Sequence, residues 1–416
     1  MGPFTRRGFL RSIGFGGLSL PAWFPRLAFS AAPSTRRDVL VCVFLRGGTD
    51  GLNVVVPFGD DDYYANRPRL AIRQPRSGGR AAIDLDGFFG FHPSLAPLKE
   101  LFDDGVLAAV HATGSPDRTR SHFDAMDFME RGTPGDRSIP TGWIGRHLAS
   151  LDTGNDSPFR AVGVGSLLPF SLRGPVTATN LSSIAGFHLQ GRPGQEVETA
   201  RFQARLSAMN AGDLWLDRQA RQTFSAISAL AAAHPGTYGP ANGAVYPDTG
   251  FGSALKQVAQ LIKADLGVEV ACVDLAGWDL HARQGGATGV MADLLAELAA
   301  GLAAFHTDLA DRMSRITLVT MSEFGRRVRD NASGGTDHGH GNVMFLLGGG
   351  VRGGRVYGDW PGLAPEQLDG PGDLAITTDF RTVLAEVVDR RLGNTNLGDV
   401  FPGFTPPAYL GVVQGG

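Results

Sequence analysis

The glycine-rich stretch GTDHGHG, residues 335–341, holds one aspartate and two histidines, Asp337, His338 and His340, among four residues. Carboxylate and imidazole groups together form the ligand set of zinc, manganese and related divalent ions. The same residue types also occur in polar surface turns that meet only solvent. The stretch therefore predicts a metal site only if further ligands reach it from elsewhere in the chain.

Further candidate ligands follow short hydrophobic segments that are typical of strands buried on both faces of a parallel sheet. In a parallel sheet these turns lie at one edge, so their side chains are expected to meet in a single crevice. The segments are residues 38–45, followed by Asp50; 106–112, followed by Ser121 and His122; 268–275, followed by Asp279 and His281; 316–321, followed by Glu323; and 343–349.

Each of these residues also has an ordinary structural interpretation. Asp50 can cap a turn, His122 can cap the helix that follows it, and Trp278 can line the core together with His281. Several acidic and imidazole groups gathered in one crevice would repel or stay unsatisfied without a cation or a polar substrate. The grouping therefore favours one or two divalent metal ions, with zinc, manganese and calcium not distinguished.

Helical patterns alternate with the predicted strands. Apolar residues recur at spacings of three and four in residues 250–266, 290–313 and 379–393. This order predicts an α/β fold with a doubly wound, mostly parallel sheet, helices on both faces and ligands at the carboxyl ends of the strands. Residues 31–416 are expected to form a single domain, with an irregular insertion or cap at about 151–249.

The first thirty residues are typical of an export signal. Arg6 and Arg7 precede a weakly apolar, glycine-rich stretch at residues 12–24, as in twin-arginine signals. That stretch is too short to span a bilayer, so we expect no stable membrane span in the mature chain. The expected partner is the twin-arginine translocase, cleavage is expected near residue 31, and the mature protein is expected to be periplasmic or secreted.

Composition excludes some classes of function. The formal net charge of −3 and the pI near 6.4 leave no basic surface of the kind that nucleic acid requires. The two cysteines, Cys42 and Cys272, lie in apolar runs, and we expect buried free thiols, although a disulfide between them stays open. The nucleophile elbow G-x-S-x-G and the zinc motif H-E-x-x-H are absent, so serine-esterase and metalloprotease activities lack support.

Several segments together resemble the exported bacterial family known as domain of unknown function 1501. The resemblance covers nearly the whole chain, and that family in turn is similar to the alkaline-phosphatase-like superfamily of phosphatases and sulfatases. The segments are FLRGGTDGLNVVVP, RSHFDAMD, GWDLHARQGG, SEFGRR, GTDHGHG and TTDFRTVLAEV. The resemblance implies an alkaline-phosphatase-like core.

The resemblance also implies site residues. It places Asp50 at the metal-binding end of the first strand, Ser121 at the position of the nucleophile, and Asp279 and His281 in a second metal site. The usual Ser-Asp-His-Gly motif is SEFG here, so Glu323 replaces the aspartate but the imidazole is missing. Asp337, His338 and His340 are expected to supply the missing ligand.

These expectations lead to an exported, metal-dependent hydrolase of a phosphate or sulfate ester, acting on an anionic small molecule or glycan. The alternative is a non-catalytic extracellular protein that binds a glycan or a protein partner. An ordinary sulfatase is disfavoured, because SPDR at 115–118 has the wrong spacing for the modified sulfatase motif. The expected catalytic residues are Ser121, His122 and Arg326, and the expected substrate contacts are Arg46, Asn53, Arg120 and Trp278.

Overall fold

Strand β1 (Val39–Arg46) shows how the sequence builds the centre of the sheet. The strand is buried along nearly its whole length. Val41 and Val43 belong to one hydrophobic cluster, whereas Leu40 and Cys42 belong to another. Because successive side chains point to opposite faces of a sheet, β1 needs a covering layer on both sides.

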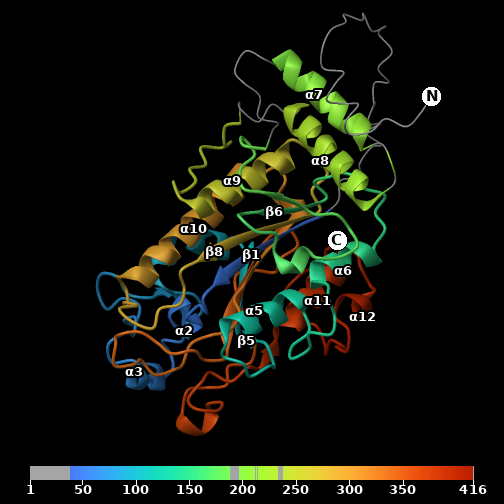
Figure 1. Cartoon of the computed structure of the whole chain (residues 1–416). Helices are drawn as coiled ribbons and strands as arrows, with labels where there is room; N and C mark the ends of the chain where they lie inside the picture. Colours follow the sequence, from blue (N-terminus) through green and yellow to red (C-terminus); the bar gives the residue numbers. More distant parts are fainter. Residues whose placement is uncertain (1–37, 188–195, 211, 213, 233–237, 416) are drawn as a thin grey trace, which may run out of the picture. The chain divides into compact units, whose positions relative to one another are not determined.

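The computed structural model describes residues 38–187, 196–210, 212, 214–232 and 238–415, which belong to one compact unit, Arg37–Gly416 (Figure 1). The expected export signal lies outside the described residues. Within them, a nine-stranded sheet has the order β11-β5-β10-β9-β1-β8-β6-β7, with β12 paired to β5. Its further strands are β5 (Leu107–Gly114), β6 (Ala161–Val164), β7 (Thr179–Leu181), β8 (Val270–Ala276), β9 (Ile316–Met321), β10 (Asn342–Gly348), β11 (Val356–Tyr357) and β12 (Thr378–Asp379).

Strand β10 is the antiparallel member of this sheet in the described part of the chain. It pairs antiparallel with both β9 and β5, whereas the other pairings in the sheet are parallel. The beginning of β10 therefore lies at the edge where β9 and β5 end. The GTDHGHG stretch directly precedes β10, so this reversal brings it to the carboxyl edge of the parallel strands.

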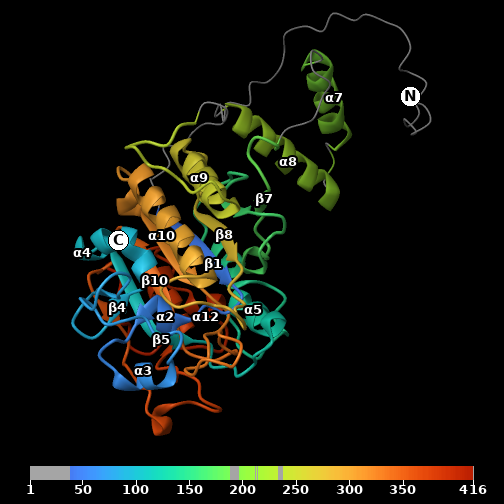
Figure 2. The same cartoon turned by 90° about the vertical axis from the view of Figure 1, so that its left-hand side faces the viewer.

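Helices cover both faces of the sheet (Figures 1 and 2). On one face α9 (Gly250–Lys263) and α10 (Val290–Asp308) pack into the first cluster. On the other face α6 (Trp143–Ser150), α11 (Phe380–Arg390) and α12 (Leu397–Val400) pack into the second. Helix α10 is long and apolar enough to cross a membrane, but it packs into the core, and a core helix meets the same criterion.

Shorter elements complete the described structure. A small antiparallel sheet, β2-β4-β3, lies in the segment after β1. The elements are α2 (Gly51–Val54), β2 (Val55–Val56), α3 (Asp61–Asn66), β3 (Ile83–Asp84), β4 (Gly90–Phe91), α4 (Lys99–Asp103), α5 (His122–Arg131), α7 (Glu196–Met209) and α8 (Trp215–Ala232), with 3-10 helices η1 (Pro93–Leu98), η2 (Phe170–Leu172), η4 (Met313–Arg315) and η5 (Pro365–Gln367).

The predicted fold class, a mostly parallel α/β sheet with helices on both faces, is confirmed. The segment expected to be an irregular insertion contains regular elements, among them helices α7 and α8. Residues 161–181 supply β6 and β7, which extend the main sheet beyond β8. The two short strands escaped prediction because they hold only a few residues each and lack a long hydrophobic run.

Candidate functional site

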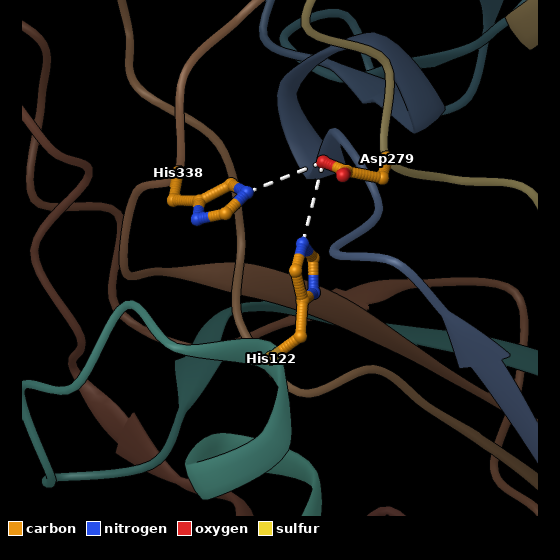
Figure 3. Close-up of side chains that lie close together, drawn as sticks. All are labelled: His122, Asp279 and His338. Atoms are coloured by element: carbon orange, nitrogen blue, oxygen red, sulfur yellow. Dashed lines mark hydrogen bonds and ion pairs between the residues drawn. The ribbon is translucent and has the colours of Figure 1, made fainter.

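Three side chains from distant parts of the chain converge at the carboxyl edge of the sheet. Asp279 Oδ1 lies 3.3 Å from His122 Nε2 and 3.2 Å from His338 Nε2 (Figure 3). One ligand atom from each residue lies within 4.8 Å of the others, which is the spacing of a metal site. His122 comes from the start of α5, Asp279 from the loop after β8 and His338 from the loop before β10.

Glycine residues allow the loop that carries His338 to lie against its neighbour. The backbone of Gly339 donates to Gly325 O, and Gly325 donates to His340 O, each at 2.9 Å. A Cβ on Gly325 would lie 1.8 Å from Gly341 O, and a Cβ on Gly339 would lie 2.3 Å from the Arg326 carbonyl carbon. Side chains at these positions would push the two segments apart, so Gly325 and Gly339 fix the place of His338.

His281 adds a further imidazole to the cluster. Its Nε2 lies 3.2 Å from Asp279 Oδ1 and 2.8 Å from His338 Nε2. Side chains of Asp279 and His281 are 49% and 45% exposed, so this side of the cluster opens to solvent.

The opposite ring nitrogen of each histidine faces an acceptor. His122 Nδ1 lies 2.8 Å from Glu323 Oε1, and His338 Nδ1 lies 2.8 Å from the Arg120 carbonyl oxygen. His281 Nδ1 lies 3.3 Å from Asp337 Oδ1. Acceptor oxygens require the proton on Nδ1, which leaves the Nε2 lone pairs directed at the cluster. Metal-binding histidines are commonly oriented by such partners.

Lone pairs that face one another need a cation or extra protons between them. The His122 Nε2 atom is buried and has no partner with hydrogen-bond geometry among the described residues. Imidazole nitrogens and one carboxylate suit zinc and related transition metals, whereas calcium prefers oxygen ligands alone. The residues present therefore fit a divalent transition metal better than calcium.

The cluster also shifts the pKa values of its members. The hydrogen bond with Glu323 raises the pKa of His122 against the opposing effect of burial. Burial would raise the pKa of Asp279, but the hydrogen bond from Arg326 and the nearby imidazoles of His338 and His122 outweigh it and hold that pKa well below its usual range. Burial lowers the pKa of His338. Asp279 is therefore ionised at neutral pH, as a metal ligand must be.

Glu323 and Arg326 are buried residues that contact members of the cluster. Glu323 is buried, and its carboxylate accepts from the Gly47 backbone N–H at 2.8 Å and contacts Ser322 Oγ at 3.2 Å. It therefore lies against His122 as an orienting partner.

Arg326, which is expected from the sequence to be catalytic, is buried, and all three of its nitrogens are engaged. Its contacts include Gly48 O at 2.6 Å, Thr336 O at 2.9 Å and Asp279 Oδ1 at 2.8 Å. In this position it fixes Asp279 and the surrounding loops.

Asp50, which was expected to be a ligand, makes different contacts. Its Oδ2 accepts from Arg67 Nη1 and from Gln284 Nε2, each at 2.6 Å. Asn53, which was expected to contact substrate, is buried in the same network, where its Oδ1 accepts from Arg67 and from Tyr63. The structure thus places both residues in a buried polar network that includes no member of the histidine cluster.

His340 and two arginines also lie outside the cluster. His340 contacts Asp369 Oδ2 and the Ser115 carbonyl oxygen, each at 2.9 Å. Arg120 pairs with Asp373 through its side chain. Arg46 pairs with Asp274 at 2.6 Å and with Glu130 at 3.3 Å.

The remaining predicted residues make local contacts. Ser121 is the N-cap of α5, where its Oγ accepts from Asp124 N at 3.4 Å. Trp278 is buried and donates to Leu275 O at 3.0 Å. Phe324, at the position where the resemblance implied an imidazole, packs its ring 4.9 Å from the His122 ring and 4.7 Å from the His338 ring.

Sequence reasoning missed three residues that set these environments. Arg67 and Gln284 bind the carboxylate of Asp50, and Asn331 donates to Asp337 Oδ1 at 3.0 Å. No local pattern marks Arg67 or Gln284. Asn331 had one available signal, because it lies in the polar loop that leads into GTDHGHG.

Comparison with known proteins identifies the family. Residues 104–401 match the family described as "Protein of unknown function (DUF1501)", and the chain belongs to it. No curated protein matches the sequence.

Several solved structures are similar to this chain. The PsFucS1 sulfatase from Pseudoalteromonas sp. has 11% identity and a TM-score of 0.36, over 78% of this chain and 65% of that one. The C-terminal periplasmic domain of EcEptC from Escherichia coli has 12% identity and a TM-score of 0.35, over 90% and 89%. Alkaline phosphatase from the Antarctic bacterium TAB5 has 11% identity and a TM-score of 0.32, over 77% and 95%. This chain spans less than two thirds of the first structure. At such low identities and TM-scores, the activity of these proteins is not assigned to this chain.

Proposed function

We propose that the protein is an exported, metal-dependent hydrolase of a phosphate or sulfate ester. The observation that carries the proposal is the convergence of imidazole Nε2 atoms on Asp279 while each Nδ1 atom faces an acceptor. Neutral imidazoles in this arrangement present lone pairs to one point, which favours a bound cation. The choice of ester rests on the resemblance of the motifs to the alkaline-phosphatase-like superfamily.

The residues that would hold the ion are His122, Asp279 and His338, and His281 lies beside them on the side that opens to solvent. Such an ion would supply Lewis acidity, polarise an ester oxygen and strengthen an attacking hydroxyl or water. One ion is proposed, because Asp50, a ligand expected from the sequence, is engaged with Arg67.

The exposure of the cluster supports catalysis over a purely structural role. Structural zinc sites are closed by four protein ligands, whereas catalytic sites keep a position open to water or substrate. Asp279 and His281 are about half exposed, so a substrate oxygen can reach the ion from solvent. Ser121 directly precedes His122, and we propose its hydroxyl as the nucleophile.

The proposal includes export. Arg6 and Arg7 ahead of the apolar stretch support transport of the folded chain by the twin-arginine translocase. The mature protein would then act in the periplasm or outside the cell.

A second function, non-catalytic binding of a glycan or a protein partner, is favoured by one observation. Each of the arginines expected to hold an anion, Arg46, Arg120 and Arg326, is already paired with a carboxylate. An ester anion would have to compete with those carboxylates, whereas a neutral glycan would not.

Metal analysis combined with hydrolysis assays tests the proposal. We expect about one equivalent of zinc or a similar ion in the purified protein and hydrolysis of p-nitrophenyl phosphate or sulfate. His338→Ala should lose both, whereas His306→Gln, a change on α10, should lose neither. A metal-loaded protein that hydrolyses neither ester would favour the binding function, and a metal-free protein that stays metal-free when zinc is supplied would overturn the site itself.

A further inference from the structure

Two cysteines and a methionine face a small buried cavity on the side of the sheet that α6 and α11 cover. Cys42 on β1 and Cys272 on β8 are paired in register, and Met321 ends β9 on the other side of β1. All three belong to the second hydrophobic cluster and line a cavity of about 10 Å³. The sulfur atoms of three adjacent strands thus border one enclosed space.

The sulfur atoms also contact one another. Cys42 Sγ lies 3.6 Å from Met321 Sδ, and Cys272 lies opposite Cys42 in the register of β1 and β8. Ser171 Oγ lies 3.9 Å from Cys272 Sγ. Both cysteines are free. The expectation of buried free thiols is confirmed, but their grouping with a methionine was not foreseen.

A buried cysteine commonly serves only as a small hydrophobic residue. Two features set this pair apart from ordinary packing. The cysteines occupy matching positions on neighbouring strands, so both thiols leave the same face of the sheet, and a third sulfur reaches them from β9. The cavity between them is about the volume of one water-sized sphere.

The ligand chemistry selects a particular kind of ion. Thiolate and thioether groups are soft ligands that select Cu(I). Zinc favours four ligands in a closed structural site, and calcium takes oxygen ligands. We propose that Cys42, Cys272 and Met321 form a site for one Cu(I) ion, separate from the histidine cluster.

Binding requires a proton to leave. Cu(I) binds the thiolate form of cysteine, so each coordinating thiol must give up its proton. Formation of a sulfur–copper bond would displace the thiol proton to solvent. The copper arrives and stays as Cu(I), so no electron is transferred.

The residues around the cavity supply a compensating positive charge and an approach from solvent. Arg46 lines the same cavity, and its guanidinium compensates negative charge that develops on a thiolate. Asp274, which pairs with Arg46, is 40% exposed and marks where the cavity approaches solvent. Met126 Sδ, 3.4 Å from Arg46 Nη1, places a further soft group beside this approach.

Competition for Cu(I) tests the proposal. The protein is titrated with Cu(I) without oxygen, in the presence of the coloured Cu(I) chelator bicinchoninate. The starting protein carries His122→Ala and His338→Ala, so that the histidine cluster cannot supply the ligands. We expect it to withhold one equivalent of Cu(I), the added change Cys42→Ala with Cys272→Ala to abolish retention, and Met321→Leu to weaken it at least tenfold.

Two results would overturn the site. Equal retention with and without the cysteines would assign the copper elsewhere, and an absence of reactive thiols in the denatured wild-type protein would show that the cysteines form a disulfide. If circular dichroism shows that the cysteine variant does not fold, the test depends on Met321→Leu. An unchanged affinity for Cu(I) in this variant excludes a three-sulfur site. The outcome is independent of the proposed hydrolase, whose ligands are absent from the starting protein.

Discussion

Two groups of polar side chains contrast at the start of the loops that follow β1 and β8. Around Asp50, donors meet acceptors, because Arg67 and Gln284 both donate to its carboxylate. Around Asp279, acceptors meet acceptors, because the Nε2 atoms of His122 and His338 converge on its Oδ1. Arg326 also donates to Asp279 but leaves those imidazole lone pairs without a partner.

Burial differs in the same way. The side chains of Arg67 and Asp50 are 0% and 3% exposed, whereas that of Asp279 is 49% exposed. A closed network with its own cation stabilises loops, and an open cluster that lacks one is suited to bind a cation from solution. An aspartate that follows a strand can therefore take either role. The donors that surround it, and not its residue type or its position, decide between a stabilising network and a cluster that binds a cation.

The largest expected effect concerns Ser121, because it tests whether the open cluster is a catalytic centre. If the hydroxyl attacks the ester, Ser121→Ala should lower kcat by at least about a thousandfold while metal content stays unchanged. Loss of the N-cap alone would cost about 1 kcal/mol of unfolding free energy. Hydrolysis of an aryl phosphate or sulfate, measured beside chemical denaturation, separates the two roles. Retained kcat with reduced stability would make Ser121 only a cap.

Arg67→Met should produce the largest loss of stability. Removal of one partner from a buried ion pair leaves an uncompensated charge and costs about 3–5 kcal/mol. We expect this loss in urea unfolding, with unchanged metal content in the fraction that stays folded. Arg69→Met is the matched control, because the Arg69 side chain is about half exposed and its pair with Asp330 is 3.3 Å long. Loss of metal from folded Arg67→Met protein would contradict the separation of the Asp50 network from the histidine cluster.

Glu323→Gln should change metal affinity by a smaller factor. The amide can still accept at one atom, but it lacks the charge that favours the Nδ1–H form of His122. Changes to such orienting partners typically weaken metal binding by about 10-fold to 100-fold. Equilibrium dialysis against a zinc buffer measures the change. An affinity equal to that of the wild type would show that Glu323 does not orient the ligand.

The smallest expected effect is a loss of stability at acidic pH that arises from a buried histidine. Burial lowers the pKa of His111 to about 4, so its folded form stays neutral while the unfolded chain gains a proton below about pH 6.5. Its contribution to stability is therefore complete above pH 6.5 and declines as the pH falls towards 4. At pH 5 the loss reaches at most about 2 kcal/mol. His111→Gln should show a flatter dependence of unfolding free energy on pH, and an unchanged slope would assign the acid sensitivity to other groups.

The fold and part of the site follow from local sequence patterns. Continuous hydrophobic runs predict β1, β8 and β9, and the polar residues after them predict where a site lies. His122, Asp279 and His338 come together because each sits in a loop at that edge. The sequence suggested that β10 would join a parallel sheet, but its reversal is what places GTDHGHG correctly.

Other parts of the site depend on long-range pairing that no local pattern reveals. Asp50 looks like a ligand in the sequence, yet Arg67 neutralises it across a separate helix and loop. His122 is expected from the sequence to be catalytic, and the contact with Glu323 directs its ring towards Asp279 and His338. Such roles depend on side-chain rotamers and on charges far away in the chain.

The reversal of β10 also bears on the order of folding. His338 contacts the Arg120 carbonyl across 218 positions of the chain, and it reaches that carbonyl only after β10 has inserted between β9 and β5. Contacts of such sequence separation form slowly, because a long loop must close before they stabilise anything. The histidine cluster is thus completed at a late stage of folding. A chain that stops before β10 would leave β5 without its partners in the described sheet, which are β10, β11 and β12, so ion binding would mark molecules whose sheet is complete.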